Sequence, residues 1–304
     1  MTILKTTNLT KKFGKFTALD GVDIEVNKGE VFGFIGPNGA GKSTAIRVLL
    51  GILKATEGEV TIFGKDAWRE AVEIHKRIAY VPGDVNLWPN LTGGEVIDFF
   101  LKLRGGNNKD KKEELINRFK LDPGKKCSTY SKGNRQKVAL VAAFSSDADL
   151  YILDEPTSGL DPLMENIFQE CVIQAKREGK SVLLSSHILS EVEKLCDRVG
   201  IIREGKMIET GSLHELRHLT RTNFVVETKE PIVSLNELKG VHGIDDREKE
   251  VSFQVDTEEL DHVIKTISQY GIIRLESAPP TLEDLFMRHY EGTDETADSG
   301  AGGA

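Results

Sequence analysis

Four short runs of consecutive apolar residues alternate with helix-like segments along the first half of the chain. The runs are residues 31–35, 78–81, 150–153 and 181–184. Runs of this kind fit strands that are buried on both faces of a parallel sheet. One intervening helix has clear end signals, because Asp161 provides an N-cap, Pro162 occupies the first helical position and Gly179 closes the segment. The pattern therefore predicts an α/β fold with a mostly parallel sheet.

Residues 88–147 follow a different pattern. Thr92 and Glu95 have the spacing of a capping box, and apolar residues then recur at helical spacing. The segment reads as all-helical. We therefore expect a helical subdomain, at about 88–147, inserted into a domain that spans residues 1–218.

The pattern changes again after residue 220. Strand-like segments at 223–227, 241–244, 251–255 and 272–275 alternate with a weak helix at 235–238 and an apolar helical stripe at 260–267. This β-α-β-β-α-β order is the ferredoxin-like order. We expect a small α+β domain over 219–290, which ends in a short helix at 281–290. The acidic, glycine-rich tail at 291–304 is expected to be disordered.

Length and composition agree with two soluble domains. The chain has 304 residues, of which 39% are hydrophobic and 29% are charged, as in ordinary globular proteins. Its net charge of −8 argues against a protein that coats nucleic acid. No stretch approaches the roughly 20 apolar residues that span a bilayer, and the N-terminal residues lack a secretory pattern. These features predict a cytosolic protein with no nucleic-acid partner.

The three cysteines, Cys127, Cys171 and Cys196, are odd in number and widely spaced. They form neither a metal-ligand pattern nor a disulfide pattern. We expect buried, reduced thiols.

The sharpest chemical signal is a phosphate loop that follows the run at 31–35 and precedes a helical segment. Glycines allow successive backbone N–H groups to turn inward, and these donors form an anion cradle with the start of the helix. Lys42 would reach the β- and γ-phosphates of a nucleotide, and the Ser43 hydroxyl would bind Mg²⁺. The loop comprises Gly36, Pro37, Asn38, Gly39, Ala40, Gly41, Lys42, Ser43 and Thr44.

Two carboxylates follow the run at 150–153. A carboxylate at the end of a parallel strand lies beside the phosphate loop, where ligands bind in open α/β sheets. Asp154 is placed to hold Mg²⁺, directly or through water, and Glu155 to accept a proton from an attacking water.

Three further motifs make a family resemblance specific. Residues 154–161, with the sequence DEPTSGLD, resemble the Walker B motif and D-loop of ATP-binding-cassette (ABC) proteins. Residues 130–136, YSKGNRQ, resemble their signature motif, and residues 185–187, SSH, match the switch histidine. The resemblance covers about residues 1–215 and implies a P-loop ATPase that uses ATP and Mg²⁺.

The resemblance also implies roles for single residues. Glu155 would be the general base and His187 would contact the γ-phosphate. Two domains would close head to tail around two ATP molecules, so that the signature of one caps the γ-phosphate bound by the other. Phe13 occupies the place of the aromatic residue that stacks on adenine, with Phe16 as its rival. The remaining nucleotide-site residues that the resemblance implies are Ser131, Gly133, Asn134 and Asp161.

The chain departs from the family pattern at two places. Gly83 stands where the family usually has a glutamine that touches Mg²⁺ and the attacking water, and Asp84 follows it. Carboxylate oxygens suit Mg²⁺, so Asp84 is a candidate replacement ligand. In the signature, Lys132 and Asn134 stand where glycine and glutamine are commoner.

The single cassette with its extra C-terminal domain resembles the ATPase subunit of bacterial or archaeal drug and antibiotic exporters. That resemblance implies an integral membrane permease as partner and a position on the inner face of the cell membrane, with Leu87 and Trp88 as candidate contacts. The alternative is a soluble ABC ATPase that remodels a macromolecular complex. Fold alone does not decide between these two functions.

Overall fold

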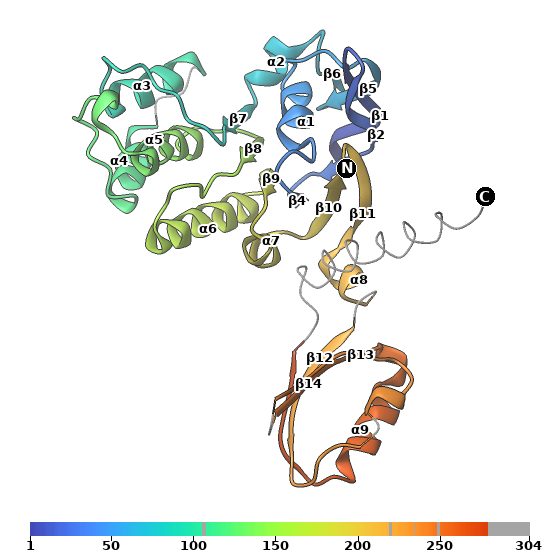
Figure 1. The fold of residues 1–304 in the computed structure, drawn as a ribbon. Helices are drawn as coiled ribbons and strands as arrows, with labels where there is room; N and C mark the ends of the chain where they lie inside the picture. Colours follow the sequence, from blue (N-terminus) through green and yellow to red (C-terminus); the bar gives the residue numbers. More distant parts are fainter. Residues whose placement is uncertain (105–107, 219–220, 234, 248–249, 279–304) are drawn as a thin grey trace. The chain divides into compact units, whose positions relative to one another are not determined.

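The computed structural model of the chain describes residues 1–278 except 105–107, 219–220, 234 and 248–249 (Figure 1). It divides into two compact units, Met1–Thr210 and Gly211–Ala304. The division therefore falls before the boundary expected at 218/219. The helix expected at 281–290 and the tail at 291–304 lie outside the described residues.

A central parallel sheet organises the first unit. In the described residues its strand order is β11-β10-β4-β9-β8-β7, and β10, β4, β9, β8 and β7 are joined by parallel pairing. All residues of β4, β8 and β9 are buried, which explains their continuous apolar runs and confirms the predicted sheet. The strands are β4 (Val31–Ile35), β7 (Ile78–Val81), β8 (Leu150–Asp154), β9 (Ser181–Ser186), β10 (Arg198–Arg203) and β11 (Lys206–Ser212).

An antiparallel sheet shares a hydrophobic core with this central sheet. Leu4, Leu9 and Leu19 of the antiparallel sheet belong to the same buried cluster as Phe32 and Phe34 of β4. Helices α1 (Lys42–Leu49) and α2 (Ala71–His75) contribute Ile46 and Ile74 among others. The strands are β1 (Thr2–Phe13), β2 (Phe16–Val22), β3 (Glu25–Asn27), β5 (Glu57–Ile62) and β6 (Lys65–Asp66).

The described part of the region 88–147 is helical. Thr92 caps its first helix as expected, because its side chain accepts from the Glu95 N–H while the Glu95 carboxylate accepts from the Thr92 N–H. The region contains α3 (Gly93–Leu103), α4 (Lys109–Arg118), the 3₁₀ turn η1 (Cys127–Thr129) and α5 (Lys132–Phe144).

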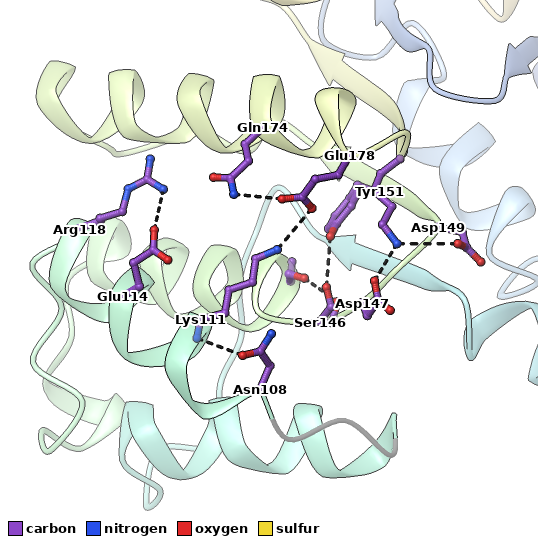
Figure 2. A network of polar contacts seen from close by, with 12 residues as sticks. Asn108, Lys111, Glu114, Arg118, Ser146, Asp147, Asp149, Tyr151, Gln174 and Glu178 are labelled. Carbon is purple, nitrogen blue, oxygen red and sulfur yellow. Dashed lines mark hydrogen bonds and ion pairs between the residues drawn. The ribbon is translucent and has the colours of Figure 1, made fainter.

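Figure 2 shows polar contacts that join this helical region to the rest of the unit. Along α4, ion pairs reach α6 (Pro162–Arg177) and the residue after it: Lys111 Nζ lies 3.7 Å from Glu178 Oε2, and Arg118 lies 2.9 Å from Glu170. These groups are at least partly exposed.

Ser146, just after α5, forms a second link that is buried. It accepts a hydrogen bond from the Tyr151 hydroxyl of β8 at its carbonyl, 3.2 Å away, and its hydroxyl accepts from the Arg104 guanidinium at 2.8 Å. This cluster therefore connects the ends of α3 and α5 to the central sheet (Figure 2).

Helix α6 begins and ends where the sequence indicates. Asp161 Oδ1 accepts from the Met164 N–H at 3.0 Å, Pro162 is the first helical residue, and Gly179 follows with φ of 76°. The next strand, β9, leads into the short helix α7 (Leu189–Leu195).

The second unit contains α8 (Leu213–His218) and a sheet with the order β13-β14-β12-β15 in its described part. Along the chain, the strands and helices follow the ferredoxin-like β-α-β-β-α-β order that the sequence predicts. One element differs: residues 235–237 form a 3₁₀ turn, η2, because the short connection cannot hold a stable α-helix. The remaining elements are β12 (Thr222–Thr228), β13 (Val241–Arg247), β14 (Glu250–Val255), η3 (Thr257–Glu259), α9 (Leu260–Ser268) and β15 (Ile272–Ala278).

The core of this unit lies between the sheet and α9. Phe224 and Phe253 stack with ring centroids 5.8 Å apart, and α9 covers them with Val263 and Ile267. The apolar stripe read from the sequence is therefore the buried face of α9.

The three cysteines are buried and unpaired, which confirms the expectation of reduced thiols. Within the described ranges, no helix has both the length and the apolar composition that crossing a membrane requires.

Candidate functional site

The phosphate loop connects β4 to α1, as predicted. Gly36, Pro37, Asn38, Gly39, Ala40 and Gly41 form the loop, and Lys42, Ser43 and Thr44 form the first turn of α1. Two of its glycines are required by geometry. Gly41 has φ of 110°, and a Cβ there would lie 2.9 Å from the Ala18 carbonyl oxygen of β2. A Cβ at Gly36 would overlap the carbonyl oxygen of Ile202.

The side chain of Lys42 is only 5% exposed and is held by the loop itself. Its ammonium donates to the carbonyl oxygens of Gly36, at 2.6 Å, and Pro37, at 3.2 Å. Burial lowers the pKa of Lys42, whereas the carboxylates of Glu155 and Asp154 act in the opposite direction. The loop thus holds a buried cation beside two carboxylates.

Asp154 ends β8 and is 5% exposed. Its Oδ1 atom has no hydrogen-bond partner within the described residues. A buried, unpaired carboxylate oxygen is costly unless a cation or water binds it. The arrangement therefore fits a cation ligand at the position that the sequence predicts.

Glu155 lies at a sharp turn directly after the strand. Its φ of 46° places it in the left-handed region, which is unfavourable for a residue with a side chain. Its N–H donates to the Ser185 carbonyl of β9 at 2.9 Å, and its Oε1 lies 3.8 Å from Lys42 Nζ. The strained turn thus directs this carboxylate toward the phosphate-loop lysine.

His187 comes from the end of the neighbouring strand, β9. Its Nδ1 lies 3.2 Å from Glu155 Oε1. The histidine side chain is 49% exposed, so part of it remains open to a ligand. Residues from three separate motifs, Lys42, Glu155 and His187, therefore meet at one edge of the parallel sheet.

The signature residues lie at the start of α5. Ser131 caps α5 and accepts from the Asn134 N–H at 3.3 Å. The turn packs against the loop that follows Glu155: Lys132 Nζ donates to Ser158 Oγ at 2.6 Å, and a Cβ at Gly133 would overlap the Gly159 carbonyl oxygen. The unusual Lys132 therefore contacts the D-loop of its own chain.

Phe13 and its rival Phe16 lie directly opposite each other where β1 and β2 pair. Both are exposed, and Lys11 Nζ lies 5.0 Å from the centre of the Phe13 ring. Because β2 also passes Gly41, this pair of strands borders the phosphate loop. Asp161, by contrast, uses its carboxylate to cap α6.

The segment after β7 brings Gly83 beside the two acidic residues. A Cβ at Gly83 would lie 3.2 Å from the Asp154 carbonyl oxygen and 3.6 Å from Glu155 Cβ. This is the place at which the family has its glutamine. The neighbouring Asp84 is exposed and accepts a hydrogen bond from Asn86 at 3.3 Å.

Farther along the same segment, Trp88 forms an exposed aromatic cluster with Phe99 and Phe100 of α3. The ring of Trp88 lies 5.4 Å from that of Phe99 and 6.1 Å from that of Phe100. The exposed fractions of the three side chains are 49%, 43% and 38%. A contiguous exposed apolar group of this kind is a candidate binding surface.

Sequence reasoning did not identify the supporting contacts of two buried residues. Gln136 of α5, the last residue of the signature motif, is fully buried, and its amide donates to the Pro156 carbonyl at 2.9 Å. Glu191 of α7, which the sequence analysis did not name, is also buried, beside Ser186 and Thr157. A polar residue inside an otherwise apolar helical stripe is a signal that could have indicated Glu191.

The chain matches the ABC transporter family over residues 19–158 and the C-terminal domain of DrrA1-3-like ATP-binding proteins over residues 211–290. An uncharacterized ABC transporter ATP-binding protein of Bacillus subtilis, YhaQ, is 33% identical over 92% of this chain and 96% of its own. The linearmycin resistance ATP-binding protein LnrL of the same species is 31% identical over 94% and 97%. The bacitracin transport ATP-binding protein BcrA of Bacillus licheniformis is 38% identical over 72% and 73%.

Solved structures give the same result. An ATP-binding subunit of an ABC transporter superposes with a TM-score of 0.67 at 31% identity, over 71% of this chain and 92% of that chain. A dimeric ATP-binding cassette in a post-hydrolysis state, bound to ADP and phosphate, superposes with a TM-score of 0.63 at 26% identity, over 69% and 99%. These matches confirm the P-loop cassette fold and the resemblance seen in the motifs. The chain belongs to the ATP-binding proteins of ABC transporters and is an ATPase of that family.

Proposed function

We propose that two copies of the protein close head to tail around two Mg²⁺–ATP molecules and that hydrolysis powers export through a separate membrane permease. The observation that carries this proposal is the meeting of Lys42, Glu155 and His187 beside the unpaired Asp154 oxygen. This arrangement supports a site in which Lys42 binds phosphate, Glu155 acts as a base and Asp154 holds a cation.

In this proposal, different residues of the chain bind the phosphates, the metal ion and the adenine of ATP. Lys42 leaves the loop carbonyls to bind the β- and γ-phosphates, and the backbone N–H groups of the loop bind their oxygens. Ser43 and Asp154 hold Mg²⁺, which supplies positive charge against the phosphates when bound. Phe13 stacks on the adenine, and Asp84 is a candidate additional Mg²⁺ ligand.

Glu155 accepts the proton of the attacking water, and His187 orients that carboxylate and contacts the γ-phosphate. General-base catalysis contributes roughly 10²–10⁴-fold to a rate. Glu155→Gln keeps the size of the side chain but removes the base. We therefore expect a loss of hydrolysis of at least about 10²-fold, with ATP binding retained. Wild-type turnover in this variant would remove the base from the mechanism.

The γ-phosphate bound by one copy is capped by Ser131, Gly133 and Asn134 of the other. The start of α5 offers a hydroxyl and backbone N–H groups, and its positive end faces the phosphate. Asp161 lies in the D-loop of the same contact region. Slow hydrolysis in Glu155→Gln should trap the ATP-bound dimer, so light scattering should give twice the monomer mass with Mg²⁺–ATP and the monomer mass with Mg²⁺–ADP.

The permease is proposed to dock on the exposed aromatic cluster of Trp88, Phe99 and Phe100, next to Leu87. The docked protein would lie on the cytoplasmic face of the membrane. Named relatives act in linearmycin resistance and bacitracin transport, which supports an exported drug-like or antibiotic substrate.

The test of the partner is purification of the tagged full chain from detergent-solubilised host membranes. We expect a multi-spanning protein in near-equal amount, and we expect Trp88→Ala to reduce it while Trp68→Ala, at another exposed tryptophan, does not. Recovery of ribosomal or DNA-repair proteins instead would favour the alternative, a soluble remodelling ATPase.

A further inference from the structure

A buried glutamate of α7 joins the two loops that carry Glu155 and His187. Glu191 is 5% exposed. Its Oε2 atom accepts from the Ser186 hydroxyl at 2.9 Å and from the Thr157 hydroxyl at 3.5 Å. Its Oε1 atom is buried without a hydrogen-bond partner in the part of the chain that the structure describes.

On one side, Glu191 fixes the turn that holds His187. The Ser186 hydroxyl donates its proton to Glu191, and the same oxygen accepts from the Ile188 N–H at 3.0 Å. Ser186 and Ile188 are the two neighbours of His187 in the sequence. Glu191 therefore orients the Ser186 hydroxyl, which in turn holds the backbone N–H of Ile188 on the other side of His187.

On the other side, Glu191 contacts the loop after Glu155. Thr157 is 5% exposed, and its carbonyl accepts from the Leu160 N–H at 2.9 Å while the Glu155 carbonyl accepts from the Ser158 N–H at 3.1 Å. The Thr157 hydroxyl thus anchors a compact turn to the same carboxylate. The two turns meet where Glu155 Oε1 lies 3.2 Å from His187 Nδ1.

Stability alone does not account for this glutamate. A buried carboxylate with one unpaired oxygen costs free energy, whereas an apolar side chain of similar size would cost less at a packed position. Burial raises the pKa of Glu191, which reflects the same cost, and the nearby Glu165 carboxylate acts in the same direction. Residues that reduce stability in this way concentrate at functional sites.

We infer that Glu191 is a positioning residue for ATP hydrolysis, which holds the turns of Glu155 and His187 at their working separation. The inference rests on the proposed roles of Glu155 and His187. Glu191 touches neither ATP nor the attacking water in this scheme. It acts through the hydroxyls of Ser186 and Thr157.

The test compares Glu191→Met with Glu191→Gln in the full chain. Methionine keeps the packing but accepts no hydrogen bond from Ser186, whereas glutamine keeps one acceptor oxygen. Displacement by 1 Å costs about 10²-fold in rate. We expect Glu191→Met to lower kcat about tenfold or more with less than about a threefold change in ATP affinity, and Glu191→Gln to recover most of kcat.

Three results would overturn the inference: a kcat within twofold of wild type for Glu191→Met, a parallel loss of ATP affinity, or no recovery by glutamine. If Glu191→Met lowers the unfolding midpoint, Ser186→Ala takes its place because it removes the same hydrogen bond from the other partner. Wild-type kcat in Ser186→Ala then overturns the inference.

Glu155→Gln is measured in parallel to separate the two proposals. If Glu155→Gln abolishes hydrolysis while Glu191→Met leaves kcat unchanged, the base assignment stands and the positioning role fails. If Glu155→Gln hydrolyses ATP at the wild-type rate, the proposed base fails, and the positioning role that rests on it is overturned as well.

Discussion

The substitution Gly133→Ala tests whether hydrolysis needs the close packing of the signature turn against the D-loop. A Cβ at this position would lie under 3.0 Å from the Gly159 carbonyl oxygen, whereas ordinary contacts begin at 3.4 Å. The obstructing atom belongs to the backbone, so no side-chain rotation relieves the overlap. The signature turn and the D-loop must therefore separate by about 1 Å to restore an ordinary contact.

The effect on stability is small because two terms oppose each other. Overpacking costs about 1–3 kcal/mol, and alanine gains up to about 1 kcal/mol over glycine inside a helix. The expected loss in the free energy of unfolding is about 0–2 kcal/mol, so Gly133→Ala should remain folded.

The effect on hydrolysis should be larger. Misplacement by 1 Å costs about 10²-fold in rate, so a shift of this size predicts a loss on the order of a hundredfold. The assay is steady-state ATP hydrolysis, with urea unfolding of the same sample. Gly124→Ala is the matched control, because its nearest obstacle is a side-chain oxygen of Asp122 at the ordinary distance of 3.4 Å. Wild-type hydrolysis by folded Gly133→Ala would refute the packing argument.

Three further predictions concern the nucleotide, the metal ion and pH. Phe13→Ala should weaken ATP binding by about 1–3 kcal/mol in equilibrium titration, and a larger loss in Phe16→Ala would transfer the stacking role to Phe16. Asp84→Ala should raise the Mg²⁺ concentration for half-maximal hydrolysis, whereas an unchanged Mg²⁺ dependence and rate would exclude Asp84 as a ligand. The pKa of Glu191 is raised on folding, so the folded state binds the Glu191 proton more tightly than the unfolded state does. The contribution of this proton to the free energy of unfolding therefore falls as pH rises from the ordinary glutamate pKa to the raised one. Glu191→Gln should lack this decline in urea midpoints, and equal pH slopes in both proteins would contradict the assignment.

Much of the fold follows from local pattern. The strands β4, β8 and β9 are buried on both faces, so their apolar runs are continuous and easy to read. The phosphate loop and the acidic pair are set by chemistry at fixed spacing. The antiparallel sheet is not apparent from the sequence, because its strands mix buried and exposed positions, as β1 does along its length.

The supporting contacts could not be read from the sequence for a different reason. Glu191 meets Thr157, and Lys132 meets Ser158, only after strands and helices distant in sequence have packed together. Nothing in the spacing of these residues marks them as partners. The nearness of Gly83 to Glu155 likewise depends on the parallel pairing of β7 with β8.

The contacts between the helical region and the rest of the unit differ in how strongly they respond to salt. Ser146 and Gln136 hold the region through buried hydrogen bonds, whereas the ion pairs from α4 to Glu170 and Glu178 are at least partly exposed. Exposed pairs each contribute about 0–1 kcal/mol and weaken as the Debye length shortens with added salt. Added salt should therefore loosen the contact between α4 and α6 while the buried contacts of Ser146 and Gln136 stay in place.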